Sequence, residues 1–300
     1  MYDCVIIGGG IAGLQAALQL GRYMHRIAVI DRHRGRSLLA RNYRNILGWP
    51  DGVSGPRLRE LGTVQARAVG VEFMEDTVVD GSKNGEGFHL KLGGGETIQA
   101  RRVLISTGLT DRIPDGIEGM KEVLGLSMYV CPDCDGYEIK DRVTVVIGAG
   151  NPGASLACEL RYWTKRVTFI NHEPEESPVS AKLQTKCQEK GISIIDGPAA
   201  RIHYASIDML THVELRNSKT IPAEKGFIAF GGNKAESDIA KKLGVERLEN
   251  GHIPVDGRTK QTNVPNIWAA GDVVAHSQLL TVAIGDGAQA AIWIHKSLIQ

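Results

Sequence analysis

A glycine-rich motif that occurs twice constrains the fold of this chain more than any other feature. In its first copy, Gly8-x-Gly10-x-x-Gly13, the glycines follow an apolar run and precede a stretch of helical periodicity and a second apolar run. This order predicts a strand, a tight turn, a helix and a parallel strand, which together make one βαβ unit. The second copy, Gly148-x-Gly150-x-x-Gly153, has the same neighbours roughly 140 residues later. The sequence therefore predicts an α/β fold with two Rossmann-like domains.

The length of 300 residues also favours two domains, because single hydrophobic cores stop growing at about this size. Two stretches bracket the second motif and are candidate hinges: 110–116, which contains Pro114 and Gly116, and 230–236, which contains Gly231 and Gly232. The segment that follows the second hinge is more easily accommodated by returning to the first domain than by forming a third. We expect one dinucleotide-binding domain to comprise 1–112 and 235–300, and a second dinucleotide-binding domain to comprise 113–234. Short strand-like pieces between the motifs, such as 72–74 and 88–92, predict small antiparallel layers.

The first motif has the context of a dinucleotide-binding site. Glycine permits the tight turn and the close approach of the backbone to a pyrophosphate, which lies at the positive end of the following helix dipole. Asp31 ends the next predicted strand, where a carboxylate accepts hydrogen bonds from the adenosine ribose. A glycine pattern alone is often only a turn, but the flanking strand, helix and acid favour binding.

The charge balance excludes several classes of partner. With 35 basic and 34 acidic side chains there is no overall field to attract nucleic acid or an anionic membrane. No apolar run approaches the roughly 18 residues that span a bilayer, and Met1-Tyr2-Asp3 leads directly into a predicted strand instead of a signal peptide. We expect a cytoplasmic protein without an integral membrane segment, acting on small molecules or other proteins.

Two of the five cysteines form a Cys-x-x-Cys pair, Cys131 and Cys134. Thiols at this spacing can close a disulfide, and the spacing lowers the pKa of one thiol so that its thiolate can attack. The alternative is half of a zinc site, but structural zinc takes four ligands, and the sequence has no second cysteine pair or close histidine pair. We expect a redox-active pair and no metal. The other cysteines are expected to be packing thiols: Cys4, Cys158 and Cys187.

The run Cys131-Pro132-Asp133-Cys134-Asp135-Gly136 resembles the active-site motif of the low-molecular-weight thioredoxin reductases, which are flavoproteins with two dinucleotide sites. Near the end of the chain, the run from Ile267 to Gly271-Asp272 resembles the second FAD motif of the same class. The resemblance covers essentially the whole chain and implies that the first site holds FAD. Gly271 and Asp272 would then hold the ribityl and pyrophosphate region. Further matches lie near the flavin in that class: Asn45, Thr107 and Gln278.

The same resemblance implies roles around the cysteine pair. Cys134 would face the flavin, and Cys131 would meet an external redox partner, either a small thiol or a dithiol protein. Asp135 would carry the proton that moves whenever the disulfide opens or closes, although a helix cap or surface carboxylate is an alternative role. A homodimer is implied by the family alone.

The second motif departs from the family at the end of the strand that follows its helix. Thioredoxin reductases have His-Arg-Arg there to bind the 2′-phosphate of NADPH, whereas this chain has Asn171-His172-Glu173. A carboxylate ~4 Å from a phosphate is repelled by up to ~4 kcal/mol per unit charge at an effective dielectric of ~20. We therefore expect NADPH to bind poorly, and Asn171 and Glu173 to accept hydrogen bonds from the ribose of NAD or of a second FAD. A solvated loop is the alternative for Glu173.

The combination of intact glycines, missing phosphate-binding arginines and an intact cysteine pair resembles the cyanobacterial diflavin-linked disulfide oxidoreductases, which implies two FAD per chain. The predicted function is thus an NADPH-independent flavoprotein that exchanges electrons between the Cys131–Cys134 pair and FAD. Three alternatives stay open: an NADH-dependent disulfide reductase, a thiol oxidase that uses oxygen, and a flavin redox sensor without turnover. Ser277, beside Gln278, replaces an arginine of the family, so the flavin-side contacts there depart from its pattern.

Overall fold

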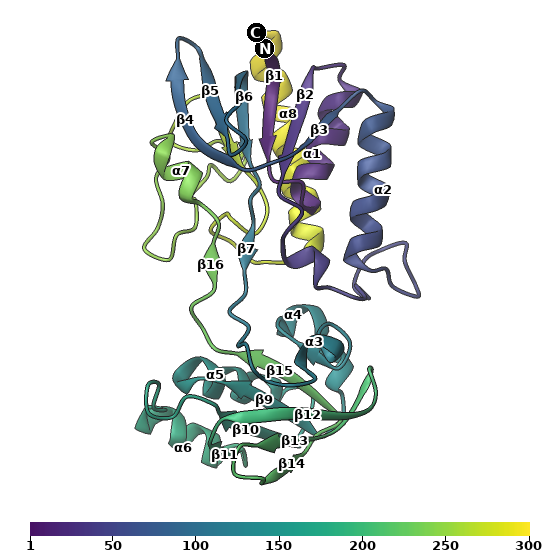
Figure 1. Ribbon diagram of the computed structural model, residues 1–300, viewed down its shortest axis with the longest axis vertical. Coiled ribbons are helices and arrows are strands. Elements are labelled where there is room, and N and C mark those ends of the chain that lie inside the picture. Colours follow the sequence, from purple (N-terminus) through teal and green to yellow (C-terminus); the bar gives the residue numbers. More distant parts are fainter. The chain divides into compact units, whose positions relative to one another are not determined.

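The chain divides into two units in the computed structural model, which describes residues 1–300. Unit 1 comprises Met1–Leu38, Val53–Thr110 and Lys234–Gln300, and unit 2 comprises Leu39–Gly52 and Asp111–Asn233 (Figure 1). The segment Leu39–Gly52, which the sequence analysis assigned to the first domain, therefore belongs to unit 2. Side-chain contacts attach it there, because Arg44 pairs with Glu138 and Arg41 donates a hydrogen bond to the carbonyl oxygen of Lys121 at 3.3 Å.

Unit 1 is built on a seven-stranded sheet in the order β3-β2-β1-β6-β5-β4, with β17 paired to β6. Its strands are β1 (Tyr2–Ile7), β2 (Ile27–Asp31), β3 (Glu72–Glu75), β4 (Val78–Asn84), β5 (Gly87–Leu92), β6 (Thr97–Ile105) and β17 (Ile267–Ala269). The strands β1, β2, β3, β6 and β17 are parallel to one another, whereas β5 is antiparallel to its two neighbours, β4 and β6. The expected antiparallel layer therefore includes β4 and β5, but Glu72–Glu75 is a parallel edge strand. It follows helix α2, which forms the second crossover connection of the βαβ pattern.

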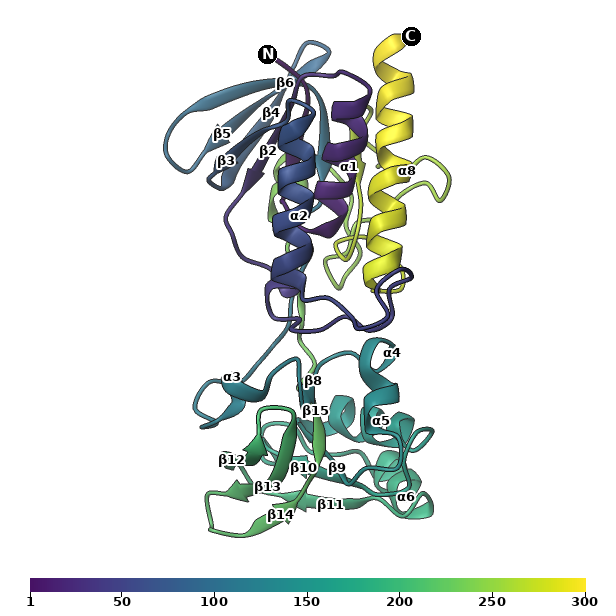
Figure 2. The same cartoon turned by 90° about the vertical axis from the view of Figure 1, so that its right-hand side faces the viewer.

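Three helices lie side by side in unit 1 (Figure 2): α1 (Ile11–Arg22), α2 (Gly55–Ala68) and α8 (Leu280–Ile299). Helix α8 packs closely on α1, because a Cβ atom added to Gly287 would overlap the carbonyl oxygen of Ala12. The remaining elements of this unit are short: η1 (Arg36–Leu38), β7 (Leu109–Thr110), β16 (Lys234–Ala235) and α7 (Asp238–Lys242). The two short strands β7 and β16 pair antiparallel where the chain leaves and re-enters unit 1. No helix is long and apolar enough to cross a membrane.

Unit 2 repeats the βαβ arrangement in a five-stranded parallel sheet of order β11-β10-β9-β15-β8. Its strands are β8 (Met128–Tyr129), β9 (Thr144–Gly148), β10 (Val167–Asn171), β11 (Ser193–Asp196) and β15 (Lys225–Ala229). A separate antiparallel sheet contains β12 (Ala199–Ser206), β13 (Met209–Leu215) and β14 (Thr220–Pro222). The helices are α3 (Met120–Val123), α4 (Pro132–Asp135), η2 (Gly136–Ile139), α5 (Gly150–Leu160) and α6 (Ala181–Glu189). The α/β fold with two Rossmann-like sheets is thus confirmed.

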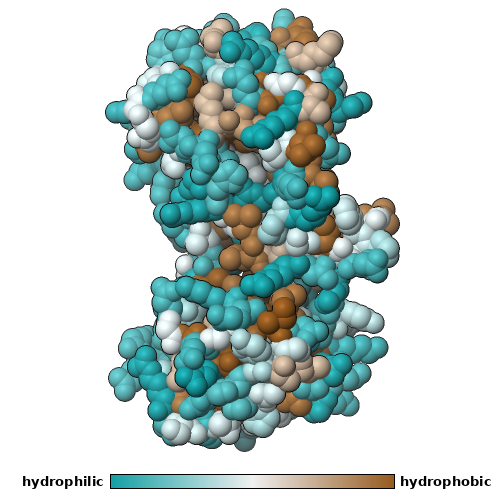
Figure 3. Space-filling view, turned by 45° about the vertical axis from the view of Figure 1, so that its right-hand side comes forward, coloured by the Kyte–Doolittle hydropathy of each residue, from teal (hydrophilic) through white to brown (hydrophobic).

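The central parallel strands of each unit, such as β1 and β9, are buried on both faces, which explains why they are continuous apolar runs. In β1, Val5 and Ile7 pack into the cluster on one face, while Cys4 and Ile6 pack into the cluster on the other. Side chains alternate between faces along a strand, so both faces must be apolar when both are covered. The face shown in Figure 3 is mostly hydrophilic, with apolar residues in several separate groups.

Phe169 offers a test of how strongly unit 2 depends on this packing. Its ring is fully buried, and it lies so close to helix α5 that a Cβ atom on Gly153 would overlap it. Phe169→Ala should lower the free energy of unfolding by about 3–5 kcal/mol, because it leaves a cavity in a core that cannot collapse. Urea unfolding followed by circular dichroism measures this loss. Ile207→Ala, at an exposed turn, is the matched control and should change it by less than about 0.5 kcal/mol; equal losses would contradict the packing argument.

Candidate functional site

The first glycine turn joins β1 to α1 in unit 1, and its three glycines have different surroundings. Gly8 has φ +106°, in the left-handed region that favours glycine, and a Cβ atom on Gly13 would overlap the carbonyl oxygen of Gly8. These two glycines are required by the protein's own backbone. Gly10 differs, because nothing lies within 4 Å of the position that its Cβ atom would occupy. The turn therefore has open space at the position where a dinucleotide-binding turn approaches the pyrophosphate.

Asp31 and Thr107 both lie at this turn. A Cβ atom on Gly9 would lie 2.9 Å from the Asp31 side chain, so the carboxylate is next to the glycines as the sequence predicted. Its partner was not predicted: Asp31 pairs with Arg59 of α2, a buried arginine that also donates to the carbonyl oxygen of Arg34 at 3.4 Å. The hydroxyl oxygen of Thr107 is buried and has no hydrogen-bond partner.

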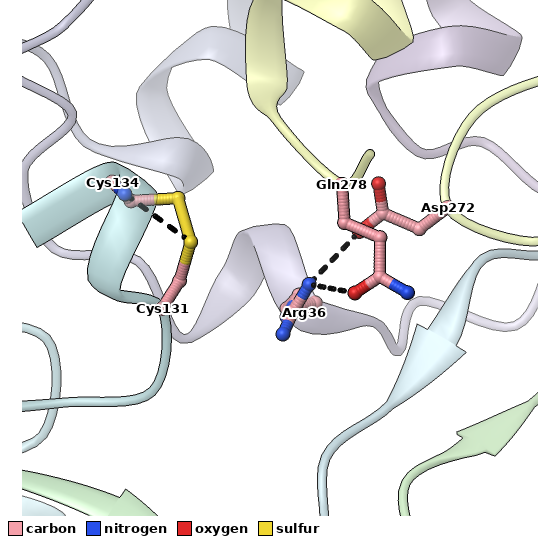
Figure 4. The surroundings of a disulfide bond; sticks show 5 residues. All are labelled: Arg36, Cys131, Cys134, Asp272 and Gln278. Atoms are coloured by element: carbon pink, nitrogen blue, oxygen red, sulfur yellow. Dashed lines mark hydrogen bonds and ion pairs between the residues drawn. A yellow bond between two sulfur atoms is a disulfide. The ribbon is translucent and has the colours of Figure 1, made fainter. Parts of the chain in front are cut away.

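Asp272 and Gln278 are joined through Arg36 (Figure 4). The guanidinium of Arg36 lies 3.2 Å from the Asp272 carboxylate and donates to the Gln278 side-chain oxygen at 3.0 Å. The Gln278 side-chain nitrogen lies 3.2 Å from Nε2 of His252, whose Nδ1 is buried without a partner. Sequence reasoning missed Arg36 and His252. The only signal for Arg36 was the basic run Arg32-His33-Arg34 just before it.

A buried carboxylate, that of Asp286, is hydrogen-bonded to the backbone of the Gly271-Asp272 turn. Asp286 of α8 accepts a hydrogen bond from the Gly271 N–H at 3.1 Å, pairs with Lys260 at 2.9 Å and bonds Nε2 of His276. Burial acts to raise the pKa of Asp286, but the hydrogen bonds from His276, Lys260 and Gly271 outweigh it and lower that pKa. The hydrogen bond to Asp286 in turn raises the pKa of His276. The network keeps Gly271 at its left-handed φ of +79°.

This network predicts a pH dependence of stability. Because the pKa of His276 is raised in the folded protein, its contribution is complete below the ordinary histidine pKa of about 6.5 and is lost as pH rises through the folded pKa. The melting temperature of the wild-type protein should therefore fall relative to His276→Gln as the pH rises above about 6.5. Scanning calorimetry measures the difference. The exposed His33→Gln should track the wild type throughout, and a pH-independent gap for His276→Gln would contradict this account.

The cysteine pair lies in unit 2 after β8, and the two sulfurs are joined in a disulfide (Figure 4). Cys131 precedes the first turn of α4, Pro132 begins that turn, and the Cα atoms of the two cysteines are 5.3 Å apart. The backbone N–H of Cys134 donates to the Cys131 sulfur at 3.2 Å. A Cβ atom on Gly136 would lie 2.6 Å from the Trp163 ring, so the glycine of the motif lets the following turn pack on that indole. Both cysteines are half-buried, and Asp135 is the last residue of α4.

Two buried polar side chains lie on the strands next to the cysteine motif. Tyr129 of β8 and Lys225 of β15 are in contact through the hydroxyl and ammonium groups at 3.2 Å, and both groups bond the carbonyl oxygen of Leu126. Burial raises the pKa of Tyr129, as do the nearby charges of Glu138 and Asp135. Burial lowers the pKa of Lys225, although Glu138 opposes the shift. The other three cysteines are buried. The sulfur atoms of Cys158 in α5 and Cys187 in α6 are 3.6 Å apart.

Asn45, which the sequence analysis placed near the flavin with Thr107 and Gln278, lies in the Leu39–Gly52 segment of unit 2. It is therefore not in the same unit as the other predicted FAD contacts. The sequence match identified the residue, but the unit to which its loop belongs depends on the contacts that Arg41 and Arg44 make elsewhere.

The second glycine turn lies between β9 and α5, and other atoms of the protein lie close to the Cβ positions of all three of its glycines. A Cβ atom on Gly148 would overlap the carbonyl oxygen of Ala229, and one on Gly153 would overlap the Phe169 ring. At Gly150, the position equivalent to Gly10, a Cβ atom would lie 2.8 Å from the carbonyl oxygen of Ser177. The sequence motif is thus present, but the structure around its middle glycine differs from that in unit 1.

Asn171 and Glu173, which the sequence analysis expected to accept hydrogen bonds from a ribose, already have partners within the protein. The Asn171 side chain is buried, accepts from the Gly150 N–H at 2.9 Å and donates to Asp196 at 3.2 Å. Both oxygens of Glu173 accept from Arg112, at 2.8 and 2.9 Å. The positive charge of Arg112, which is 61 residues away in sequence, therefore reduces the predicted repulsion between Glu173 and a phosphate. Between them, His172 accepts from the Ala199 N–H at 3.0 Å, and burial lowers its pKa, so it is not a substitute cation.

Two Rossmann-like sheets and a Cys-x-x-Cys disulfide at the start of a helix define a flavoprotein disulfide oxidoreductase of the thioredoxin reductase type. Residues 2–287 match the model of the family described as pyridine nucleotide-disulphide oxidoreductase, and the chain belongs to this family. It is 29% identical to the thioredoxin reductase of Streptomyces coelicolor over 301 residues, covering 97% of this chain and 92% of the relative. It is 28% identical to that of Mycolicibacterium smegmatis, covering 97% and 95%.

Solved structures agree with this assignment. The crystal structure of HlmI is 30% identical, with a TM-score of 0.87 and coverage of 99% of this chain and 92% of that one. The thioredoxin reductase of Streptococcus pyogenes is 25% identical, with a TM-score of 0.87 and coverage of 100% and 98%. The chain is thus a flavin-dependent, thioredoxin reductase-like enzyme.

Proposed function

We propose that this enzyme exchanges electrons between an external thiol and FAD through Cys131 and Cys134, without using NADPH. The observation that carries the proposal is the Cys131–Cys134 disulfide, with an N–H donor directed at the Cys131 sulfur. Independence from NADPH is supported by Asn171-His172-Glu173, which contains no arginine, while the nearby Arg112 is already paired with both carboxylate oxygens of Glu173. The curated relatives are thioredoxin reductases, so a small thiol or a dithiol protein is the proposed partner. A homodimer is proposed on the resemblance alone.

The residues of unit 1 fit an FAD. The open space beside Gly10 is where the pyrophosphate backbone contact would form, and the unpartnered Thr107 hydroxyl is available to a ligand. Asp31 would hold the adenosine ribose, and Gly271, Asp272 and Gln278 would hold the ribityl and flavin side. When bound, FAD would supply a two-electron carrier for the cysteine pair.

The cysteine chemistry follows from the disulfide geometry. A substrate thiolate attacks the Cys131 sulfur, the S–S bond breaks, and Cys134 leaves as a thiolate. A second substrate thiol then attacks the mixed disulfide, and Cys131 is released as a thiolate that accepts the Cys134 N–H. Two substrate thiols are oxidised to a disulfide and the enzyme disulfide is reduced to a dithiol. Asp135, adjacent to Cys134, is the proposed carrier of the proton that each thiol gains or loses.

The proposed function has two possible versions, which differ in the dinucleotide bound at the second glycine turn. The resemblance to diflavin-linked oxidoreductases predicts a second FAD, and the retained glycines Gly148, Gly150 and Gly153 are the feature that favours it. An NADH-dependent reductase with NAD at the same turn is the alternative. The number of FAD molecules released per chain separates these two forms, because the diflavin form requires two.

Anaerobic reduction of the bound flavin tests the proposed electron route. Excess dithiothreitol should bleach the flavin absorbance of the wild-type enzyme, whereas NADPH should leave it unchanged. Cys134→Ser should abolish dithiol bleaching, because no disulfide remains to accept electrons from a thiol. Cys158→Ser removes a buried thiol outside the motif and should bleach like the wild type. Ready bleaching by NADPH would overturn the proposal, and unchanged bleaching of Cys134→Ser would remove the cysteine pair from the mechanism.

Gly10→Ala tests the proposed FAD contact without disturbing the protein. Gly10 has φ −73° and open space beside it, so alanine should fold normally and yet hinder the approach of a pyrophosphate. We expect FAD affinity to fall by about tenfold or more, equivalent to losing one or two hydrogen bonds to a charged group. Gly285→Ala on α8 also adds a methyl group into open space, and should retain full FAD content. Equal affinities of the two variants, measured by titrating the apoprotein, would reject the contact.

A further inference from the structure

The middle glycines of the two turns are equivalent in sequence, but they face different surroundings. In a dinucleotide-binding turn this glycine lacks a side chain so that the backbone can approach the pyrophosphate. At Gly10 the space is open, whereas at Gly150 it contains the backbone of Ser177, whose carbonyl oxygen and Cβ atom would lie 2.8 and 3.2 Å from an added methyl group. The chain itself fills the position that a ligand would need.

The two turns also differ in backbone conformation. In unit 1 the first glycine, Gly8, has a positive φ of +106°, and helix α1 begins at Ile11, after Gly10. In unit 2 the positive φ lies at the middle glycine, Gly150, at +49°, and helix α5 already begins at that residue. The second turn is therefore not a copy of the first with its ligand removed. It has a different shape that accommodates Ser177.

The backbone N–H at the second turn is already used. Gly150 donates to the Asn171 side-chain oxygen at 2.9 Å, and the Asn171 nitrogen lies 3.4 Å from the Ser177 carbonyl oxygen, so one buried side chain joins the turn to the chain that covers it. In an anion-binding turn such N–H groups are directed at the phosphate. A dinucleotide at Gly150 would have to break this bond and leave buried Asn171 without its donor.

Residues 172–180, here called the covering segment, are fastened at both ends. At its start, both carboxylate oxygens of Glu173 accept hydrogen bonds from Arg112. The backbone carbonyl oxygen of Glu173 accepts from the Ser177 N–H at 2.8 Å. At its end, the Ser180 N–H donates to the side chain of Asn151 in α5 at 2.9 Å. These contacts lie on either side of Ser177 and keep its backbone against Gly150.

We propose that the covering segment takes the place of a dinucleotide at the second glycine turn, so that unit 2 binds neither a nicotinamide nor a second FAD. The glycines are retained because the protein's own backbone and side chains pack against them. Unit 2 then acts as the support of the Cys131–Cys134 disulfide, and the enzyme has one FAD, in unit 1. This inference goes beyond the proposed function, which leaves the occupant of the second turn open.

Hydrogen exchange of the FAD-loaded enzyme tests the proposal directly. The Gly150 and Ser177 amides should be protected without any added ligand, and neither ADP nor FAD at millimolar concentration should alter exchange in 148–155 or 172–180. Flavin released on denaturation should equal one FAD per chain. Rapid exchange at Gly150 in the wild type, a second FAD, or added protection by ADP would each overturn the proposal.

A matched pair of asparagine variants tests whether the hydrogen bond between Asn151 and Ser180 keeps the covering segment in place. Asn151→Ala removes the acceptor of the Ser180 N–H and should speed exchange of that amide by about five- to tenfold, the effect of one hydrogen bond. Asn217→Ala removes a similar bond to the Lys219 N–H in an exposed turn and should leave 172–180 unchanged. Equal exchange of 172–180 in both variants would overturn the role of Asn151. ADP binding that leaves NADPH unable to bleach the flavin would reject this inference alone and leave the proposed function standing.

Discussion

Direct contact between the end of a strand and the start of a helix organises both units. In unit 1, Gly13 of α1 lies against the Gly8 carbonyl oxygen, and in unit 2, a Cβ atom on Gly148 would lie 3.1 Å from the Cα atom of Gly153 in α5. A side chain at either position would have to displace backbone, so the helix could not rest on the sheet at this distance. In unit 1 the same closeness extends outward, because α8 packs on α1 through Gly287. The buried network of Asp286 with Gly271, His276 and Lys260 follows from that placement of α8.

The two turns show that one sequence motif can serve packing alone or packing and binding together. The outer glycines of each motif have the same role, since both sets let a helix approach its sheet. Only the middle glycine distinguishes the turns, because Gly10 faces open space and Gly150 faces Ser177. If the second turn is covered by the chain itself, it holds no second electron carrier, which agrees with the proposed exchange of electrons with an external thiol.

Much of the site could be predicted, because its signals are local in sequence. Glycine spacing and apolar runs predicted β1, α1 and β2 and their counterparts in unit 2, and the two-residue spacing of Cys131 and Cys134 predicted their disulfide. The sequence did not predict that Arg112 pairs with Glu173. Asp31 similarly has Arg59 as its partner. Nothing near either acid in the sequence identifies these arginines, since any of 35 basic side chains could have been brought there.

The sequence by itself determined the fold class, the two glycine turns and the redox pair, because each depends on residues a few positions apart and on the period of apolar side chains. Only the tertiary structure decided what surrounds those residues. It assigned Leu39–Gly52 to unit 2, joined Arg36 to Asp272 and Gln278, and brought Ser177 against Gly150. The physical reason is that the charge and free space of a site depend on contacts between residues far apart in the chain, and such contacts have no local pattern.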